Sequence, residues 1–279
     1  MGKPVDRPAP RFTPTTHSLA FTQFSKDQRF TMTKFRKIAL ALLAAPLALG
    51  IASCGSNDAG DEVSGDAIDP IVAPEGSAWT ETVTISEYDG YILGNPDAPI
   101  KLMEYGSLTC GGCANFAQTA SEKIKTEYVA SGRVSFELRN QIHNGIDLVL
   151  ARLVRCGQPE SFHPLADQVW INLNDVLTRA QANPQALEAA MTLPENERFV
   201  AVGEATGLLD FFAARGLSSD QARTCLADAA SVSAIADRSN QQSEELGVTG
   251  TPTFFLNGRK LGVSQWRDIE PMLQKAGAR

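Results

Sequence analysis

Residues 104–113, Glu-Tyr-Gly-Ser-Leu-Thr-Cys-Gly-Gly-Cys, place a Cys-x-x-Cys motif directly after an apolar segment. The segment 100–105 predicts a buried strand, because most of its side chains are large and apolar. After the cysteines, apolar residues recur every four positions from Phe116 to Tyr128, which predicts a helix with one buried face. The motif therefore lies where a strand passes into a helix.

The position of Cys110 at the start of this helix predicts a reactive thiol. The first N–H groups of a helix are unpaired and its dipole favours negative charge, so a thiol there ionises at lower pH than an ordinary cysteine. Cys113 lies one turn further along and is placed to attack a mixed disulfide formed on Cys110. We therefore predict that Cys110 is the nucleophile and Cys113 the resolving cysteine of a redox-active disulfide, with no other cofactor.

Two other uses of this motif are a zinc site and an inert structural disulfide. Zinc would need further ligands, but His143 and His163 are 20 residues apart and the sequence contains no second Cys-x-x-Cys motif. We therefore expect no metal site. The inert disulfide stays open as an alternative, although the position of the motif favours redox chemistry.

The pattern of strands and helices around the motif predicts an α/β fold. Residues 82–85 are β-branched, and residues 134–138 alternate apolar and polar side chains, so both predict strands. Residues 146–246 look helical almost throughout, and a β-hairpin over 253–262 and a helix over 264–276 close the chain. The simplest architecture is one small mixed sheet with a helical domain inserted into it. The expected parts are 79–145 and 247–279 for the sheet domain and 146–246 for the helical insertion.

Four segments resemble the DsbA family of thiol–disulfide oxidoreductases. They are the motif segment 104–113, Leu-Gly-Asn-Pro-Asp-Ala-Pro at 93–99, Gly-Val-Thr-Gly-Thr-Pro-Thr-Phe at 247–254 and the Asn-Gly turn at 257–258. The resemblance covers about residues 80–279. It implies a thioredoxin-like fold with an inserted helical domain. It also implies an enzyme that exchanges disulfides with exported, cysteine-containing proteins and is served by a membrane or soluble redox partner.

The resemblance assigns roles to three further residues. Pro252 is expected to be cis, with Thr251 presenting its backbone to the substrate beside Cys110; the alternative is a trans proline at the start of an edge strand. Glu104 matches a buried acid that handles protons for the resolving cysteine. The alternative for Glu104 is a solvated carboxylate on a strand.

Gly112 is a departure from the family pattern. Many family members carry a histidine between the two cysteines, which helps to stabilise the thiolate. Gly111 and Gly112 offer only backbone donors. We therefore predict a redox couple that is less oxidising than that of the strongest oxidant of the family.

A second pair of cysteines lies in the predicted helical insertion. Cys156 and Cys225 are left over once Cys110 and Cys113 are paired and Cys54 is assigned to the N-terminal signal. In an oxidising compartment two such cysteines favour a structural disulfide. The alternative is two buried free thiols.

An export signal is predicted at residues 32–53. Basic residues precede an apolar run from Ile38 to Ala52, which is shorter than the roughly 20 residues that a membrane-spanning helix needs. The run ends in Ile-Ala-Ser-Cys, which resembles a bacterial lipobox and predicts that Cys54 is lipidated. The alternative is an ordinary secretory signal cut near Ala52. Either signal exports the protein.

The segments on each side of the signal are expected to have no fold of their own. Residues 1–31 precede the signal, so we interpret Met32 as the true start and 1–31 as an upstream extension. Residues 55–78 are rich in Gly, Ser, Asp and Pro and predict a flexible linker. From these features we predict that the protein is anchored by a lipid and located in the periplasm or cell envelope.

Charge is distributed unevenly along the chain. Residues 1–53 hold 8 Lys+Arg and 2 Asp+Glu, whereas residues 54–279 hold 17 Lys+Arg and 30 Asp+Glu. The acidic body argues against nucleic acid or an anionic membrane surface as a partner. A second hypothesis from another class of function is a non-catalytic, thioredoxin-like binding lipoprotein with a structural disulfide.

Overall fold

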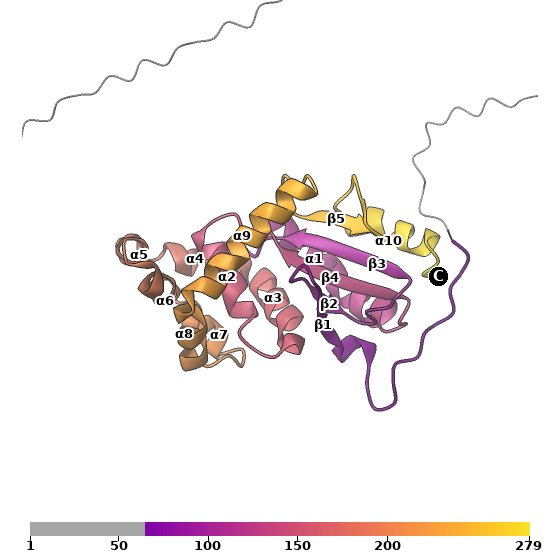
Figure 1. The fold of residues 1–279 in the computed structure, drawn as a ribbon, viewed down its shortest axis with the longest axis horizontal. Helices are drawn as coiled ribbons and strands as arrows, with labels where there is room; N and C mark the ends of the chain where they lie inside the picture. The colour runs from indigo at the N-terminus through magenta and orange to yellow at the C-terminus, as the bar shows by residue number, and fades with distance from the viewer. Residues whose placement is uncertain (1–64) are drawn as a thin grey trace, which may run out of the picture. The chain divides into compact units, whose positions relative to one another are not determined.

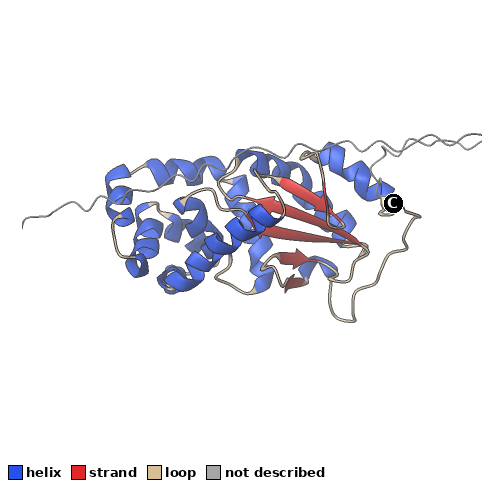
Figure 2. Ribbon diagram, turned by 45° about the horizontal axis from the view of Figure 1, so that its top comes forward, coloured by secondary structure: helices blue, strands red, loops and turns tan. Residues whose placement is uncertain are grey.

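Strand β3, Ile100–Gly106, lies in the middle of a mixed sheet in residues 65–279, the part of the chain that the computed structural model describes (Figures 1 and 2). The strand order is β1-β2-β4-β3-β5-β6. Strands β3 and β4 are parallel, and every other neighbouring pair is antiparallel. The other strands are β1 (Val83–Ile85), β2 (Tyr91–Leu93), β4 (Val134–Asn140), β5 (Thr253–Leu256) and β6 (Arg259–Lys260).

The register of the parallel strands β3 and β4 places Glu104 on an apolar face of the sheet. Leu102 pairs with Phe136 and Glu104 pairs with Leu138. Side chains two residues apart on a strand share a face, so Glu104 lies on the same face as Leu102. This face carries the core of the sheet domain.

The first helix after the motif covers this face. Helix α1, Gly111–Lys123, continues as the π-helical turn η2, Ile124–Val129. Phe116 of α1 packs on Phe254 of β5 with ring centroids 4.4 Å apart, and Trp266 at the start of α10 (Trp266–Lys275) packs on Phe116 from the other side. The amphipathic pattern of the sequence thus produces a helix that buries its apolar stripe against the sheet.

The helical insertion joins β4 to β5 and forms the end of the molecule away from the sheet (Figures 1 and 2). Its last helix, α9, runs back from the helical group toward β5 (Figure 1). This arrangement confirms the predicted thioredoxin-like fold with a helical insertion. The helices are α2 (Gly145–Val154), α3 (Phe162–Ile171), α4 (Leu173–Gln181), α5 (Pro184–Met191), α6 (Glu195–Ala205), α7 (Leu208–Ala213), α8 (Ser219–Ala227) and α9 (Ala229–Glu245), with the 3-10 turns η1 (Trp79–Glu81) and η3 (Pro159–Ser161).

The insertion adds buried aromatic side chains to the apolar core and contains a disulfide. Phe211 and Phe212 of α7 are buried and lie with ring centroids 5.4 Å apart. Cys156, just after α2, is joined to Cys225 of α8 by a disulfide with a Cα–Cα distance of 5.9 Å. The disulfide therefore links the end of α2 to α8 through two cysteines that are 69 residues apart in sequence.

Two elements differ from the sequence prediction. Strand β2 has only three residues between Gly90 and Gly94, too few for an alternating pattern to be visible. The predicted hairpin is present, but β6 is shortened to Arg259–Lys260.

Residues 65–78 also differ from the expected flexible linker. The N–H groups of Gly65, Ile68 and Ile71 donate to carbonyl groups of Lys275, Gly277 and Ser131 at 2.8–3.0 Å. These carbonyl groups lie at and beyond the ends of α10 and η2, where helical partners run out. The described part of the linker therefore docks on the sheet domain.

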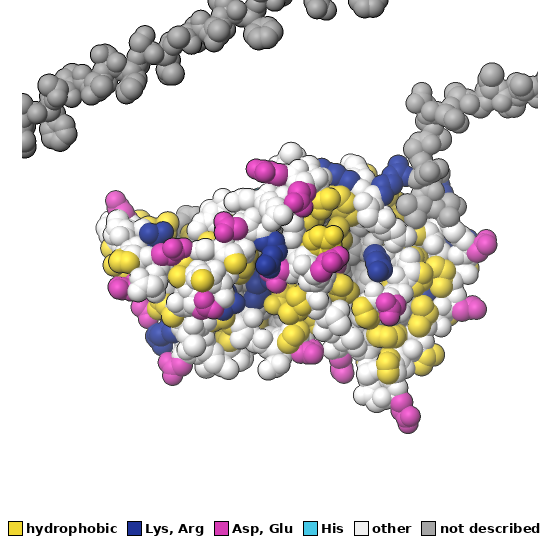
Figure 3. Space-filling view, in the orientation of Figure 1, with side chains coloured by type: hydrophobic (Ala, Val, Ile, Leu, Met, Phe, Trp, Pro, Cys, Tyr) yellow, Lys and Arg dark blue, Asp and Glu magenta, His cyan; other side chains and the backbone are white. Residues whose placement is uncertain are grey.

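The expectations for residues 1–31, for the signal 32–53 and for lipidation of Cys54 fall outside the described residues. Within residues 65–279, no helix combines the length and the hydropathy needed to cross a membrane. Acidic side chains are spread over the face shown in Figure 3, with Lys and Arg interspersed among them.

Candidate active site

Cys110 is the N-cap residue of α1. Its backbone is extended, and its sulfur accepts a hydrogen bond from the N–H of Cys113 at 3.4 Å. The two intervening glycines occupy the first helical positions, so their N–H groups point toward the same end of the helix. This geometry surrounds the sulfur with donors that favour negative charge.

The Thr251–Pro252 peptide bond is cis and lies against the sulfur of Cys110. The sulfur of Cys110 lies 3.3 Å from the carbonyl oxygen of Thr251 and donates to it when the thiol carries its proton. The sheet produces this approach, since Thr253 at the start of β5 pairs with Tyr105 near the end of β3. Two segments 141 residues apart in sequence therefore meet in one site.

The pKa of Cys110 is lowered to about 5. The hydrogen bond from the Cys113 thiol contributes most to this shift, and the side chain of Thr251 and the backbone N–H of Gly112 act in the same direction. Partial burial opposes the shift. At neutral pH Cys110 is therefore a thiolate, and it is partly exposed.

Cys113 has the opposite character. It is fully buried, and its pKa is raised by its hydrogen bond to Cys110, by burial and by the charge of Glu104. Both cysteines are free thiols in this structure. One sulfur is therefore ready to attack, whereas the other needs a proton acceptor before it can do so.

Glu104 supplies a carboxyl group beside Cys113. It is 1% exposed, and burial raises its pKa well above the usual range, with the negative charges of Asp167 and Cys110 adding to the effect. A hydrogen bond with Cys113 acts in the opposite direction. The carboxyl is therefore not the solvated strand carboxylate that stood as its alternative.

His143 is a site residue that the sequence did not single out. Its Nε2 atom lies 3.3 Å from the Oγ1 atom of Thr251. It follows β4 by three residues, at the edge of the sheet where β3 also ends. The sequence signal that could have identified His143 is its position just after the predicted strand 134–138. The end of that strand lies beside the end of β3, where α1 begins.

The loop before Cys110 is held by residues of the insertion. Asp147 is buried at the start of α2, and its two oxygens accept the N–H groups of Leu108 at 2.8 Å and of His143 at 2.9 Å. Trp170 of α3 donates its indole N–H to the carbonyl of Ser107 at 3.0 Å. No local sequence pattern indicates these contacts, since they join segments far apart in the chain.

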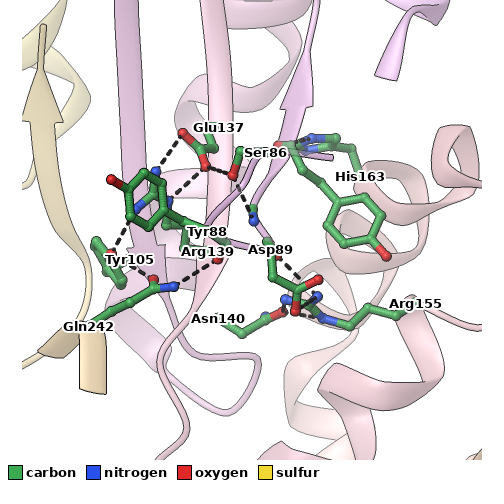
Figure 4. A network of polar contacts seen from close by, with 12 residues as sticks. Ser86, Tyr88, Asp89, Tyr105, Glu137, Arg139, Asn140, Arg155, His163 and Gln242 are labelled. Carbon is green, nitrogen blue, oxygen red and sulfur yellow. Dashed lines mark hydrogen bonds and ion pairs between the residues drawn. The ribbon is translucent and has the colours of Figure 1, made fainter. Parts of the chain in front are cut away.

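A second polar network ties the insertion to strands β3 and β4 (Figure 4). Arg155, just after α2, donates to Asp89 at 2.8 Å and to Asn140 of β4. The hydroxyl of Tyr105 on β3 donates to Gln242 of α9 at 2.8 Å. Both ends of the insertion are thus held on the sheet.

The remaining candidate residues lie apart from this site. Cys156 and Cys225 contact the carbonyl of Arg152 in the insertion. His163 binds the carbonyl of Tyr91, and burial lowers its pKa to about 4, so it is a neutral structural residue. Within residues 65–279, no group of three His, Cys, Asp or Glu side chains is placed to hold a metal ion.

A thioredoxin fold with a thiolate-forming cysteine at a helix start, next to a buried partner thiol, defines a thiol–disulfide oxidoreductase. Comparison with known proteins gives the same class. The family model described as "Thioredoxin" matches residues 86–275, so the chain belongs to this thioredoxin family.

The relatives and solved structures are named as proteins that act on disulfides. A Rickettsia conorii protein named as a protein-disulfide oxidoreductase is 26% identical over 227 residues, which are 81% of this chain and 74% of the relative. The protein-disulfide isomerase of Novosphingobium aromaticivorans superimposes with a TM-score of 0.61 at 26% identity, covering 66% of this chain and 94% of that one. Wolbachia pipientis alpha-DsbA1 shares the fold, with a TM-score of 0.54 at 23% identity over 68% of this chain and 92% of its own. The chain is therefore a protein-disulfide oxidoreductase of the thioredoxin family, and it shares its fold with DsbA.

Proposed function

We propose that this chain exchanges disulfides with exported, cysteine-containing proteins through a mixed disulfide on Cys110. The observation that carries the proposal is the environment of this sulfur. It is a partly exposed thiolate at a helix start, with the carbonyl of Thr251 at 3.3 Å and a buried partner thiol, Cys113, on the next turn.

The oxidation of a substrate dithiol would run in two exchanges. In the first, a substrate thiolate attacks the Cys110 sulfur of the Cys110–Cys113 disulfide, and Cys113 leaves with the electron pair and takes a proton. In the second, the other substrate thiolate attacks the substrate sulfur that is bonded to Cys110. The substrate disulfide forms, the bond to Cys110 breaks, and Cys110 leaves as a thiolate. The substrate loses two electrons and the enzyme disulfide gains them. Reduction of a substrate is the reverse sequence, and the two cysteines are the only redox group required.

Each neighbouring group has a role in this proposal. The low pKa of Cys110 makes it a good leaving group in the second exchange. The Thr251–Pro252 segment offers its backbone to the extended chain of the substrate beside the sulfur. Glu104 takes and returns the proton of Cys113, because it is the carboxyl that contacts this thiol.

The location is proposed from the sequence. The apolar run of residues 32–53 and the Ile-Ala-Ser-Cys ending support export with a lipid anchor on Cys54. A protein held in this way in the periplasm or cell envelope would meet substrates that arrive with free thiols. A membrane or soluble redox partner would restore the starting state of Cys110 and Cys113.

The test is to trap the mixed disulfide. In the full chain, Cys113→Ser removes the sulfur that releases a substrate, so thiol-bound proteins should accumulate on Cys110 in cells. The control is the Cys110→Ser variant, which should trap none. If the Cys113→Ser chain carries no disulfide-linked protein and the purified wild type reduces no insulin, the chain does not exchange disulfides and the binding-protein hypothesis takes its place.

A further inference from the structure

Residues 141–144, which join β4 to α2, contact both segments that meet at the active site. On one side, Nε2 of His143 lies 3.3 Å from Oγ1 of Thr251, in the cis-proline segment. On the other side, the side-chain amide of Asn144 donates to the hydroxyl of Thr109 at 3.2 Å. The short connection therefore lies between the cis-proline segment and the residue that precedes the nucleophilic cysteine.

The backbone of this connection is fixed independently of the His143 ring. The N–H of Ile142 donates to Oγ of Ser239 on α9 at 2.8 Å, and the N–H of His143 donates to Oδ2 of Asp147 at 2.9 Å. Both acceptors belong to buried side chains. The ring itself is exposed, but with its backbone already ordered only its own torsions have to be fixed for it to reach Thr251.

Thr251 contacts the nucleophile as well as this ring. Its carbonyl oxygen lies 3.3 Å from the sulfur of Cys110, and a hydrogen bond of its side chain to the same sulfur helps to lower the pKa of Cys110. A thiolate has no proton, so the hydroxyl of Thr251 can only donate to it. A hydroxyl has a single proton, and toward every other neighbour its oxygen then acts as an acceptor.

We propose that His143 is a positioning residue whose Nε2–H donates to Oγ1 of Thr251 and thereby directs the hydroxyl proton of Thr251 to the sulfur of Cys110. This inference deepens the proposed function and rests on it. The imidazolium and one of the two neutral tautomers both carry a proton on Nε2, so the arrangement does not require a charged ring. The reverse direction, from the hydroxyl to Nε2, would turn the proton away from the sulfur.

This arrangement acts on one state of Cys110. In the thiol state the sulfur donates to the carbonyl of Thr251, and in a disulfide it carries no charge for a donor to stabilise. The hydroxyl of Thr251 therefore stabilises the thiolate alone, which is the leaving group when an oxidised substrate departs. A donor that stabilises only the thiolate favours the reduced enzyme and makes its disulfide more oxidising.

The test is a double-mutant cycle in the full chain, with His143→Leu, Thr251→Val and the two combined. Leucine cannot donate, and valine keeps the branched shape of threonine without its hydroxyl. His143→Gln is the conservative variant, because its side-chain amide is an uncharged donor. The matched control is Gln141→Leu, which removes a donor of the same connection that contacts the carbonyl of Val248 instead of Thr251.

Two measurements are made on each protein. The first is thiolate absorbance of the reduced protein against pH, in which the step that is missing from Cys110→Ser is assigned to Cys110. The second is the equilibrium constant with glutathione, which compares the reduced form with the disulfide. Urea unfolding of each variant confirms that it is folded under these conditions.

His143→Leu should move the absorbance midpoint of Cys110 to higher pH by about half a unit to one unit. It should also shift the glutathione equilibrium roughly threefold to tenfold toward the disulfide, which is the range for one hydrogen bond. In the Thr251→Val background the same substitution should have no further effect, because the hydroxyl that it directs is absent. His143→Gln should restore most of the wild-type values, and Gln141→Leu should retain them.

Two results would overturn the inference. One is an absorbance midpoint of His143→Leu equal to that of the wild type. The other is an effect of His143→Leu that persists in the Thr251→Val background, which would show that the ring acts through its charge or through the fold. Failure of the proposed function is recognised separately, since Cys113→Ser would then trap no protein whatever the midpoint of Cys110.

Discussion

A Cβ atom on Gly112 would lie 3.1 Å from Cδ of Pro252 and 3.6 Å from the sulfur of Cys110. Gly112 is therefore the position at which the helix start and the cis-proline segment touch. Gly111, its neighbour in the same motif, has no such contact within 4 Å of an added Cβ. The two glycines therefore have different surroundings although both lie at the first turn of α1.

Substitution of these glycines by alanine should have opposite results. Gly111→Ala adds a better helix former in open space, so it should stabilise the protein by about 0.5–1 kcal/mol. Gly112→Ala should lose that gain, since the new methyl group displaces Pro252 at a cost of about 1–3 kcal/mol. It should also slow formation of the mixed disulfide. Urea unfolding and the rate of reaction with glutathione disulfide measure both effects, and equal behaviour of the two variants would contradict the contact.

The ionisation of Cys110 should make the stability of the reduced protein depend on pH. The pKa of this thiol is about 5 in the folded protein, against roughly 8.5 for an ordinary cysteine in the unfolded chain. Between these values the unfolded chain binds the proton and the folded chain does not, so stability rises with pH across this range. The contribution is complete above the unfolded pKa and is lost as pH falls through about 5.

The measurement is the difference in unfolding midpoint between the reduced wild type and Cys110→Ser, taken from acidic to alkaline pH. Because the sulfur is partly exposed, solvent screening keeps the difference smaller than the pKa shift alone implies. A difference that does not change with pH would show that Cys110 titrates as an ordinary thiol.

The sequence was sufficient for features that carry a local pattern. The strand-to-helix position of Cys110 predicted its place at the start of α1, and the structure brings it to Thr251. The contacts of Asp147 and Trp170 could not be predicted, because they depend on how the insertion packs on the sheet.

Asp147 should be essential for the loop that carries the motif. Asp147→Ala leaves the N–H groups of Leu108 and His143 without acceptors, which should cost about 3 kcal/mol or more for two lost bonds to a carboxylate. Asp147→Asn keeps one acceptor oxygen and should lose less. Urea unfolding gives the stabilities, and thiolate absorbance should show a raised pKa of Cys110 in the alanine variant. Wild-type stability of Asp147→Ala would exclude this role.

The Cys156–Cys225 disulfide should affect the stability of the fold but not the thiol exchange of Cys110. Replacing Cys156 and Cys225 by serine opens a loop that joins residues 69 apart, and the chain-entropy relation predicts a loss of about 4 kcal/mol. The thiol exchange rate of Cys110 should be unchanged, since the disulfide contacts Arg152 and not the active site. Denaturant unfolding and the glutathione reaction separate these effects, and a changed exchange rate would contradict the separation.

The redox potential of the Cys110–Cys113 couple should lie between the values of the two reference oxidoreductases of this fold. A lower pKa of the nucleophilic thiol stabilises the reduced form and makes the disulfide more oxidising. The pKa of Cys110, about 5, falls between about 3.5 in DsbA and about 7 in thioredoxin. We therefore expect a potential between about −120 mV and −270 mV. Equilibration with glutathione buffers measures it, and the Cys156→Ser/Cys225→Ser variant ensures that only the active-site pair is titrated. A potential at the DsbA limit would show that donors beyond the backbone of Gly112 and the Cys113 and Thr251 groups stabilise the thiolate.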